Sequence, residues 1–574
     1  MRTMGFLLVC ALGVLGLGTV FAAQPAHACG GLFCNSAQPV NQAAERILFV
    51  ENGDGTVTAV IEIQYEGPAE SFSWVLPVPG VPDVAVSSTA AFDRLQAATN
   101  PQCTLNTTFE EGCGGPGSGN SPGAPTGAPR GGSGASGDGG VVVVAAGTVG
   151  PFDYQVIEVD AELEEPVDAA ITWLTMNGYD VTALGPEVLG PYLAEGLNLL
   201  AFRLNKSNDS GSIRPIVISY EAELPFIPIR PTAVAANDDM GVMVWVAGAA
   251  RAVPDNYKAL ELNEALINWF NPMSTYNDVV SAAADEAGGQ GFVTEAAQDS
   301  DTLDKVVLQD WETTEFDRIV NQQYASAADF VIEASSYFGG WDGFEDALRG
   351  ALTLPDDIAF SDVLNCPSCY LGNAGVTFDE GVFRVALYED VYRPMLQAQE
   401  LLLSRPYVTR LYTTMSAEEM TMDPAFNFNA DLDDVSNVHT AEQVIECDGG
   451  FHVVLPQGGT VHGTTQGTWP NALSDEDLPA ARKILQLGTE GQGQVVEDNS
   501  DVIADFLAQR TPGSTGSDRD AGDRDGGASE LAGGGDGCDC AAAPGATRAR
   551  THAASGASLL ALLALGWLVR RRRP

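Results

Sequence analysis

Residues 46–65 of this 574-residue chain are RILFVENGDGTVTAVIEIQY. The apolar run at 46–50 leads into a turn of asparagine, aspartate and glycine at 52–55, and apolar and mostly polar residues then alternate over 57–65. Two such segments on either side of a glycine-containing turn are typical of a β-hairpin with one buried face. This hairpin predicts that the first half of the chain is built around a β-sheet.

The segments that follow the hairpin extend this prediction. Further strands are expected at residues 72–78, 141–145, 152–159, 199–204 and 216–223, and helices at 91–98 and from Val167 to a cap at Gly178. Because strands and helices mix without strict alternation, we predict an α+β fold. Its N-terminal domain, residues 29–250, should be β-rich and mostly antiparallel.

The next part of the chain, residues 251–510, shows mainly helical periodicity. Helices are expected near 259–269, 276–287, 327–337 and 395–403, and strands return around 407–413 and 451–455. We therefore predict a helix-rich region with a few strands.

Two stretches contain too little apolar bulk to offset the entropy of ordering them. Residues 114–140 are mostly glycine, serine, proline and alanine, which predicts a flexible insert within the first domain. Residues 511–537 have a similar composition with alternating aspartate and arginine. This segment is interpreted as a disordered stalk.

The N-terminus carries an export signal. Arg2 precedes an apolar stretch at 6–22, and the small residues Ala26 and Ala28 stand just before Cys29. This order predicts a signal peptide over residues 1–28, cut between Ala28 and Cys29. A lipoprotein signal would also be cut before a cysteine, so lipidation of Cys29 is the alternative, although Ala26 stands where such a signal normally carries leucine.

The C-terminus, residues 538–574, combines Cys538 and Cys540 with an apolar segment at 555–569 and four arginines at 570–573. The apolar segment is shorter than the roughly 20 residues that span a bilayer comfortably. A cysteine pair, a short transmembrane helix and a terminal arginine cluster resemble the MYXO-CTERM sorting signal of myxobacterial surface proteins. The resemblance implies cleavage by a sorting protease, lipid on Cys538 or Cys540, and a body on the outer surface of the outer membrane. The alternative is a permanent inner-membrane anchor with the body in the periplasm.

Several phrases in the first half share a second resemblance. They are CGGLFC from Cys29 to Cys34, WVLPVP from Trp74, VGPF from Val149, and WL from Trp173 followed by NGY from Asn177. Together they resemble the DUF2330 family, a family of bacterial proteins with no assigned activity. The resemblance implies export but supplies no mechanism, catalytic residue or cofactor.

The charge balance excludes one class of partner. The chain has 77 acidic and 28 basic residues, a formal net charge of -49. Nucleic-acid binding requires a basic surface, so we expect no nucleic-acid partner. An acidic surface suits an extracellular protein, and a surface that collects divalent cations is the sharper alternative.

Seven cysteines of the exported body are disulfide candidates, because export leads to an oxidising compartment. They are Cys29, Cys34, Cys103, Cys113, Cys366, Cys369 and Cys447. The simplest pairings join the near neighbours Cys29 with Cys34 and Cys103 with Cys113. A further disulfide is then expected among Cys366, Cys369 and Cys447. The alternative is a zinc site formed by these three cysteines and His452.

Enzyme motifs are weak. A GxSxG match at 119–123 falls in the flexible insert, where no nucleophile elbow can form. His439, His452 and His462 have no recognisable partner spacing, and His452 and His462, which lie near expected strand residues, are interpreted as structural or exposed. We therefore assign no catalytic, metal or cofactor residue. The first hypothesis is an envelope-anchored, non-enzymatic protein that binds an extracellular partner or is structural. The alternative is a surface hydrolase or metal-dependent enzyme that uses the His452 region or scattered carboxylates.

Overall fold

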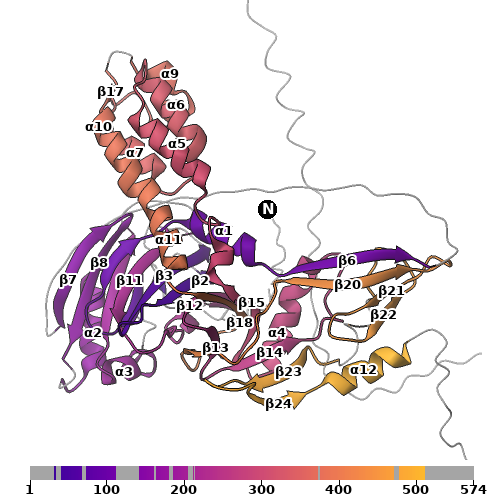
Figure 1. Ribbon diagram of the computed structural model, residues 1–574. Coiled ribbons are helices and arrows are strands. Elements are labelled where there is room, and N and C mark those ends of the chain that lie inside the picture. Colours follow the sequence, from indigo (N-terminus) through magenta and orange to yellow (C-terminus); the bar gives the residue numbers. More distant parts are fainter. Residues whose placement is uncertain are drawn as a thin grey trace, which may run out of the picture. The chain divides into compact units, whose positions relative to one another are not determined.

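The computed structural model describes residues 32–33, 41–66, 73–110, 141–160, 163–179, 185–204, 211–212, 214–234, 236–372, 375–470, 473 and 478–510 (Figure 1). The chain splits into two compact units, Met1–Thr515 and Gly516–Pro574, and all described residues belong to the first. The expected insert at 114–140 and stalk at 511–537 lie outside the described residues.

The predicted hairpin forms the middle of a large sheet. Strands β2 (Asn41–Glu51) and β3 (Thr56–Glu66) pair antiparallel around a turn in which Gly53 and Gly55 adopt positive φ angles of 80° and 88°. Glycine adopts such angles without steric cost. The Asp54 carboxylate accepts hydrogen bonds from the Thr56 amide and hydroxyl at 3.0 and 2.6 Å, which fixes the turn.

The sheet has eleven strands within the described ranges. In spatial order they are β24 (Gln494–Asp498), β23 (Ala481–Gln486), β14 (Lys258–Leu262), β15 (Gly291–Asp299), β18 (Tyr407–Met415), β12 (Ala236–Gly248), β2, β3, β11 (Ile216–Glu221) and β5 (Asp83–Val86), and β10 (Gly211–Ser212) also pairs with β3. Most neighbours are antiparallel, but β12 runs parallel to β2 and β14 parallel to β15. Strands from both sides of residue 250 therefore share one sheet.

A second sheet packs against one face of the large sheet. Its order is β1 (Leu32–Phe33), β4 (Ser73–Val78), β9 (Asn198–Leu204), β8 (Phe152–Val159) and β7 (Val141–Val149). Alternate residues such as Trp74 and Phe202 share a core with Ile47 and Ile61 of the hairpin. The other face is covered by α2 (Pro166–Met176) and α3 (Pro186–Ala194), so both faces of this sheet are buried.

Helices cover the opposite face of the large sheet. Figure 1 shows them grouped together, with α11 leading from the group to the sheet. They are α1 (Thr89–Thr99), α5 (Asp310–Asn321), α6 (Ala327–Phe338), α7 (Phe344–Gly350), α8 (Phe360–Asn365), α9 (Pro367–Tyr370), α10 (Glu380–Ala386), the π-helical segment Leu387–Tyr392 and α11 (Arg393–Leu403), with a small ribbon of β16 (Leu352–Thr353) and β17 (Thr377–Phe378). Trp245 and Val50 of the sheet share a core with Phe92 of α1 and Phe316 of α5.

A third sheet extends from the far end of the large one (Figure 1). Its order is β22 (Thr460–Gly463), β21 (Phe451–Val454), β20 (Val438–Ile445) and β6 (Gln102–Phe109). It shares a core with α4 (Tyr276–Glu286), α12 (Ser500–Gln509) and strands of the large sheet. A separate ribbon pairs β13 (Arg251–Pro254) with β19 (Phe426–Asn429). The sheets and helices together confirm the predicted α+β class.

One predicted helix is wrong. Residues 259–269 form strand β14 and then turns, not a helix. Strand β14 lies between β15 and β23, and the buried residues Ala259, Leu260 and Leu262 pack on both of its faces. A short apolar run buried on both faces cannot be told from a buried helix by periodicity alone.

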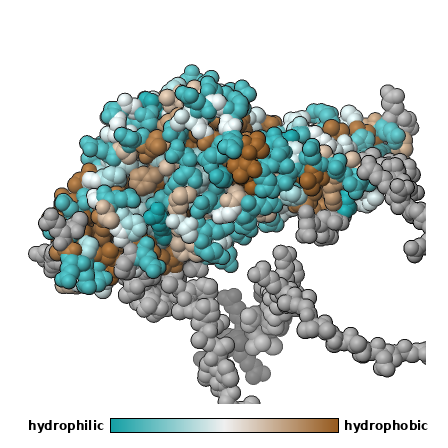
Figure 2. Space-filling model, turned by 90° about the horizontal axis from the view of Figure 1, so that it is seen from below, coloured by the Kyte–Doolittle hydropathy of each residue, from teal (hydrophilic) through white to brown (hydrophobic). Residues whose placement is uncertain are grey.

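The hydropathy of the surface and of the helices was compared with what contact with a membrane requires. Figure 2 shows a face on which hydrophilic side chains predominate and hydrophobic ones form scattered patches. None of the helices in the described ranges combines the length and apolar character that a membrane crossing requires. The apolar segment at 555–569 lies outside those ranges.

A buried carboxyl on β2 makes the fold sensitive to pH. Glu45 is buried, and burial raises its pKa from the ordinary 4.5 to about 7, against the opposing effect of a 3.3 Å hydrogen bond from Gln42. Below about pH 4.5 this carboxyl is protonated in both the folded and the unfolded chain. As the pH rises towards 7, the unfolded chain loses the proton first, so the free energy of unfolding falls by on the order of 3 kcal/mol.

Replacing Glu45 with glutamine should remove this contribution. We expect the variant to match the wild type near pH 4.5 and to be more stable by on the order of 3 kcal/mol at pH 8. Denaturant unfolding of both chains from pH 4.5 to 8 measures the difference between their free energies of unfolding. The other carboxyls contribute equally to both chains, so their contributions cancel in this difference. A difference that stays constant over this range would show that Glu45 is not the titrating group.

Candidate metal centre

Two histidines and a glutamate meet on the third sheet. His452 on β21 and His462 on β22 are directly opposite each other in the antiparallel register, and their rings are 5.5 Å apart between centroids. Phe451 and Val461, the residues that precede them, point into the core, so the two imidazoles project from the other face. Glu446 follows the end of β20 and reaches the same face.

The three side chains lie within coordination range of one another. Glu446 Oε1 is 2.8 Å from His452 Nδ1 and 4.0 Å from His462 Nδ1. Each residue offers one ligand atom, and these atoms all lie within 4.8 Å of one another. A zinc ion with nitrogen and oxygen ligands at about 2.0–2.1 Å holds them about 3.3 Å apart. Shifts of less than about 1 Å would therefore produce coordination geometry.

The turn after β20 holds Glu446 in place. The Glu446 amide donates to the Gly450 carbonyl at 3.0 Å, and Gly449 has a φ of 94°, which favours glycine. A Cβ on Gly450 would come within 3.1 Å of Glu446 Oε2. The Cys447 amide donates to Glu110 Oε2 at 3.0 Å, which joins the turn to the end of β6.

The surroundings of His462 disfavour its charged form, although the charge of Glu446 acts in the opposite direction. Its Nδ1 is buried and has no hydrogen-bond partner within the described part of the chain. Burial lowers the pKa of His462, and the neighbouring His452 lowers it further. A neutral imidazole with a free lone pair is the form that binds metals.

A cavity of about 540 Å³ touches one of the three ligands. Its lining includes His462 but neither Glu446 nor His452, and its other walls include Trp469, Leu473, Leu507 and Arg510. Three protein ligands leave one position of a tetrahedral ion open for water or another molecule. The arrangement can therefore hold an ion and leave one position for a further ligand.

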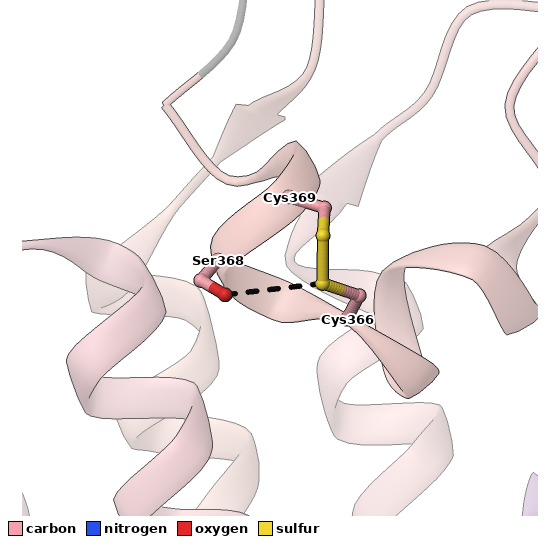
Figure 3. Close-up of a disulfide and its surroundings, with 3 residues drawn as sticks. All are labelled: Cys366, Ser368 and Cys369. Carbon is pink, nitrogen blue, oxygen red and sulfur yellow. Dashed lines mark hydrogen bonds between the residues drawn. A yellow bond between two sulfur atoms is a disulfide. The ribbon is translucent and has the colours of Figure 1, made fainter.

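The cysteines predicted to form a disulfide lie elsewhere. Cys366 and Cys369 are bonded to each other at the start of α9, with their Cα atoms 5.3 Å apart and Ser368 Oγ 3.8 Å from Cys366 Sγ (Figure 3). This confirms a disulfide within the set Cys366, Cys369 and Cys447. It also excludes the alternative zinc site that needed both as thiolates. Cys447 is itself disulfide-bonded, and its partner lies outside the described residues.

The predicted pairing of Cys103 with Cys113 is wrong, because Cys103 carries a free thiol. Strand β6 ends at Phe109, and the amide of the next residue, Glu110, still donates to the Ile445 carbonyl at 2.9 Å, so the chain stays extended to this point. At about 3.3 Å per residue, Glu110 is roughly 23 Å from Cys103. Three more residues span at most about 11 Å, and a disulfide needs Cα atoms within about 7 Å.

Other predicted site residues cannot be placed. Ala28, Cys29, Cys34, Cys113, Cys538 and Cys540 lie outside the described residues. His439, for which the sequence showed no partner spacing, is half-buried and has its Nδ1 2.7 Å from Glu264 Oε1. It lies apart from the other two histidines, on the core-facing side of the third sheet.

Comparison with known proteins identifies a family match in the N-terminal part of the chain. The family described as "Uncharacterized protein conserved in bacteria (DUF2330)" matches residues 23–324. Neither the curated proteins nor the solved structures contain a match. The match covers the β2–β3 hairpin and the second sheet but ends before Glu446, His452 and His462. With more than half of its length matched, the chain belongs to the DUF2330 family of bacterial proteins.

Proposed function

We propose that this protein binds a divalent transition-metal ion through Glu446, His452 and His462. The observation that carries the proposal is the convergence of three ligand atoms, from two strands and a turn, within 4.8 Å of one another. Two imidazoles and one carboxylate suit zinc, iron, nickel or copper better than calcium or magnesium, which prefer all-oxygen sites. This supports the metal-dependent alternative over a purely structural role.

The number of ligands favours presentation of the ion over a closed structural role. Structural zinc sites have four protein ligands, whereas three meet here within the described residues. An ion held there would bind a water molecule or a small anionic ligand. The proposed function is therefore metal-dependent binding or hydrolysis at the cell envelope.

Metal analysis of the full chain tests the site. After EDTA dialysis and titration with Zn²⁺, we expect one ion per chain by calorimetry and elemental analysis. Replacing His452 or His462 with alanine should weaken binding by more than the 10–100-fold typical of outer-shell changes, because each removes a ligand. His439→Gln is the matched control and should bind zinc like the wild type. Unchanged zinc affinity in both alanine variants would rule the site out.

We also propose that the protein is exported and held at the outer surface of the outer membrane by its processed C-terminal tail. Support comes from the signal peptide pattern at 1–28 and from the cysteine pair, short apolar segment and arginine cluster at 538–574. A sorting protease and the membrane are then its partners, and an extracellular molecule would meet the metal site. Retention in the inner membrane is the competing outcome. Surface labelling and the intact mass of the mature chain distinguish the two.

A further inference from the structure

A second cavity, of about 330 Å³, lies between the large sheet and the third sheet. Its walls are mainly apolar and include Leu260, Leu262, Ile267, Val293 and Leu485. Ligand sites in proteins are typically cavities of about 300–1,000 Å³ with apolar walls and a few polar groups that fix orientation. All its lining residues are among those described, and the metal ligands Glu446, His452 and His462 do not line it.

One carboxylate oxygen in this cavity lacks a hydrogen-bond partner within the described residues. The Glu264 side chain is only 4% exposed, and its Oε1 lies 2.7 Å from His439 Nδ1. Its Oε2 is buried and has no hydrogen-bond partner within the described part of the chain. Leaving a buried acceptor unsatisfied costs about 1–3 kcal/mol, and more for a charged group. A donor from a ligand would remove this cost.

The charges of the other lining carboxylates are already paired with arginines. Glu261 pairs with Arg482 at 2.9 Å, and Glu295 pairs with Arg410 at 2.6 Å. The hydroxyl of Tyr276 donates to Glu295 at 2.7 Å. Glu295 Oε2 also lacks a hydrogen bond but faces the Arg410 cation, so among the lining carboxylates Glu264 has the buried oxygen with neither a hydrogen bond nor an ion pair within the described residues.

The electrostatics of the cavity favour a cation. Cys103 lies beside His439 in the parallel register of β6 and β20, and burial followed by the charge of Glu264 raises the pKa of its thiol to about 12. The thiol therefore stays protonated at neutral pH and is a poor nucleophile. The lining also contains Arg251, whose Nη1 donates to the Asp433 carbonyl at 2.8 Å and whose buried Nε has no hydrogen-bond partner within the described residues. The nearby Asp433 and Asp434 offset its charge.

We propose that this cavity binds a small organic ammonium ion, with the amine donating to Glu264 Oε2 and an apolar body against the leucine and valine walls. A charge-assisted hydrogen bond in a buried site is roughly twice as strong as a neutral one and gives orientation. A metal ion fits less well, since the cavity residues Glu264, His439 and Cys103 do not form a cluster within coordination range in the described ranges. The proposal does not depend on the metal site.

Matched indole probes test the charge preference. Calorimetric titration of the full chain, with EDTA present, would compare tryptamine, tryptophol and indole-3-acetate, which share a ring and differ in charge. We expect tryptamine to bind about tenfold or more tightly than tryptophol, and indole-3-acetate not to bind. Equal affinity for tryptamine and tryptophol would show that the cavity does not select for charge, and no binding of either would show that it takes up neither probe. Both outcomes would overturn the proposal.

Two variants test whether Glu264 causes the preference for tryptamine over tryptophol. Glu264→Gln keeps an oxygen that can accept from His439 and replaces Oε2 with a donor, so it should abolish the preference for tryptamine over tryptophol. Glu261→Gln lines the same cavity and should preserve it. Tryptamine binding should also persist when His452 and His462 are alanine. A preference that survives in Glu264→Gln would refute the assignment, and if that variant fails to fold, the wild-type comparison of probes still decides.

Discussion

Replacing Arg410 with methionine is expected to lower the free energy of unfolding by about 3–5 kcal/mol at pH 7. Arg410 and Glu295 are 2% and 1% exposed and form an ion pair with Nε and Oε2 2.6 Å apart. Removing the cation leaves a buried carboxylate without its main counter-charge, with the hydrogen bond from the Tyr276 hydroxyl still in place. Desolvating an uncompensated charge is among the few single changes that cost this much.

The expected loss depends on pH. Burial raises the pKa of Glu295, and Arg410 is the main group that opposes this rise. Without Arg410 the folded-state pKa moves further above the unfolded value. The penalty should therefore vanish below the unfolded pKa, where the carboxyl is protonated in both states, and grow as the pH rises. Denaturant unfolding at several pH values measures it.

Two further variants separate charge from packing. Glu295→Gln combined with Arg410→Met removes both charges and keeps an oxygen for the Tyr276 hydroxyl, so it should recover most of the lost stability. Arg482→Met breaks the more exposed pair with Glu261 and should cost less than about 1 kcal/mol. If the double variant is as unstable as Arg410→Met alone, the loss comes from the packing of Arg410 on Trp245 and not from the buried charge.

Local sequence patterns predicted most elements of the fold. Strand β8 spans the predicted residues 152–159, and α6 begins at the predicted residue 327 and ends one residue late. In both cases a single periodicity and clear flanking residues agree with the final structure. The β2–β3 hairpin was equally clear because its turn needs glycine at two positions.

Pairings between distant segments were not visible in the sequence. The parallel contact of β2 with β12 joins strands almost 200 residues apart, and the antiparallel contact of β12 with β18 carries the same sheet across residue 250. Pairing with β15 and β23 likewise turned 259–269 from a predicted helix into β14 and turns. Apolar residues there face two neighbouring layers, so they carry no period that distinguishes strand from helix.

The candidate metal centre could have been found in part. The strand at 451–455 was predicted, and Gly458 and Gly459 mark the turn of a hairpin. Pairing across this turn places His452 opposite His462, as the register shows. Glu446 follows a different strand, β20, and a turn that contains Gly449 and Gly450 holds it beside the two histidines. No sequence spacing indicates this contact. The free thiol of Cys103 likewise depends on the pairing of β6 with β20, which keeps the chain extended from Gln102 to Phe109 and has no local sequence signal.

Replacing both Cys538 and Cys540 with alanine is expected to abolish surface display. If the tail is a sorting signal, cleavage near these cysteines removes the apolar segment and the arginines, and the lost membrane affinity must be replaced. A lipid on the remaining thiol would supply roughly 0.8 kcal/mol per buried methylene. Without either thiol, the precursor should stay uncut and keep its tail.

Intact mass and surface labelling measure both consequences of this double replacement. The variant should retain Trp567 and show little labelled protein, whereas Asp539→Ala, which leaves both thiols, should be cut and displayed like the wild type. Deleting residues 570–573 should also impair sorting, because a basic cluster stops export and sets orientation. Normal display of the double alanine variant with Trp567 still attached would instead identify the segment as an ordinary anchor. The protein would then reach the surface by a route that does not use the cysteines.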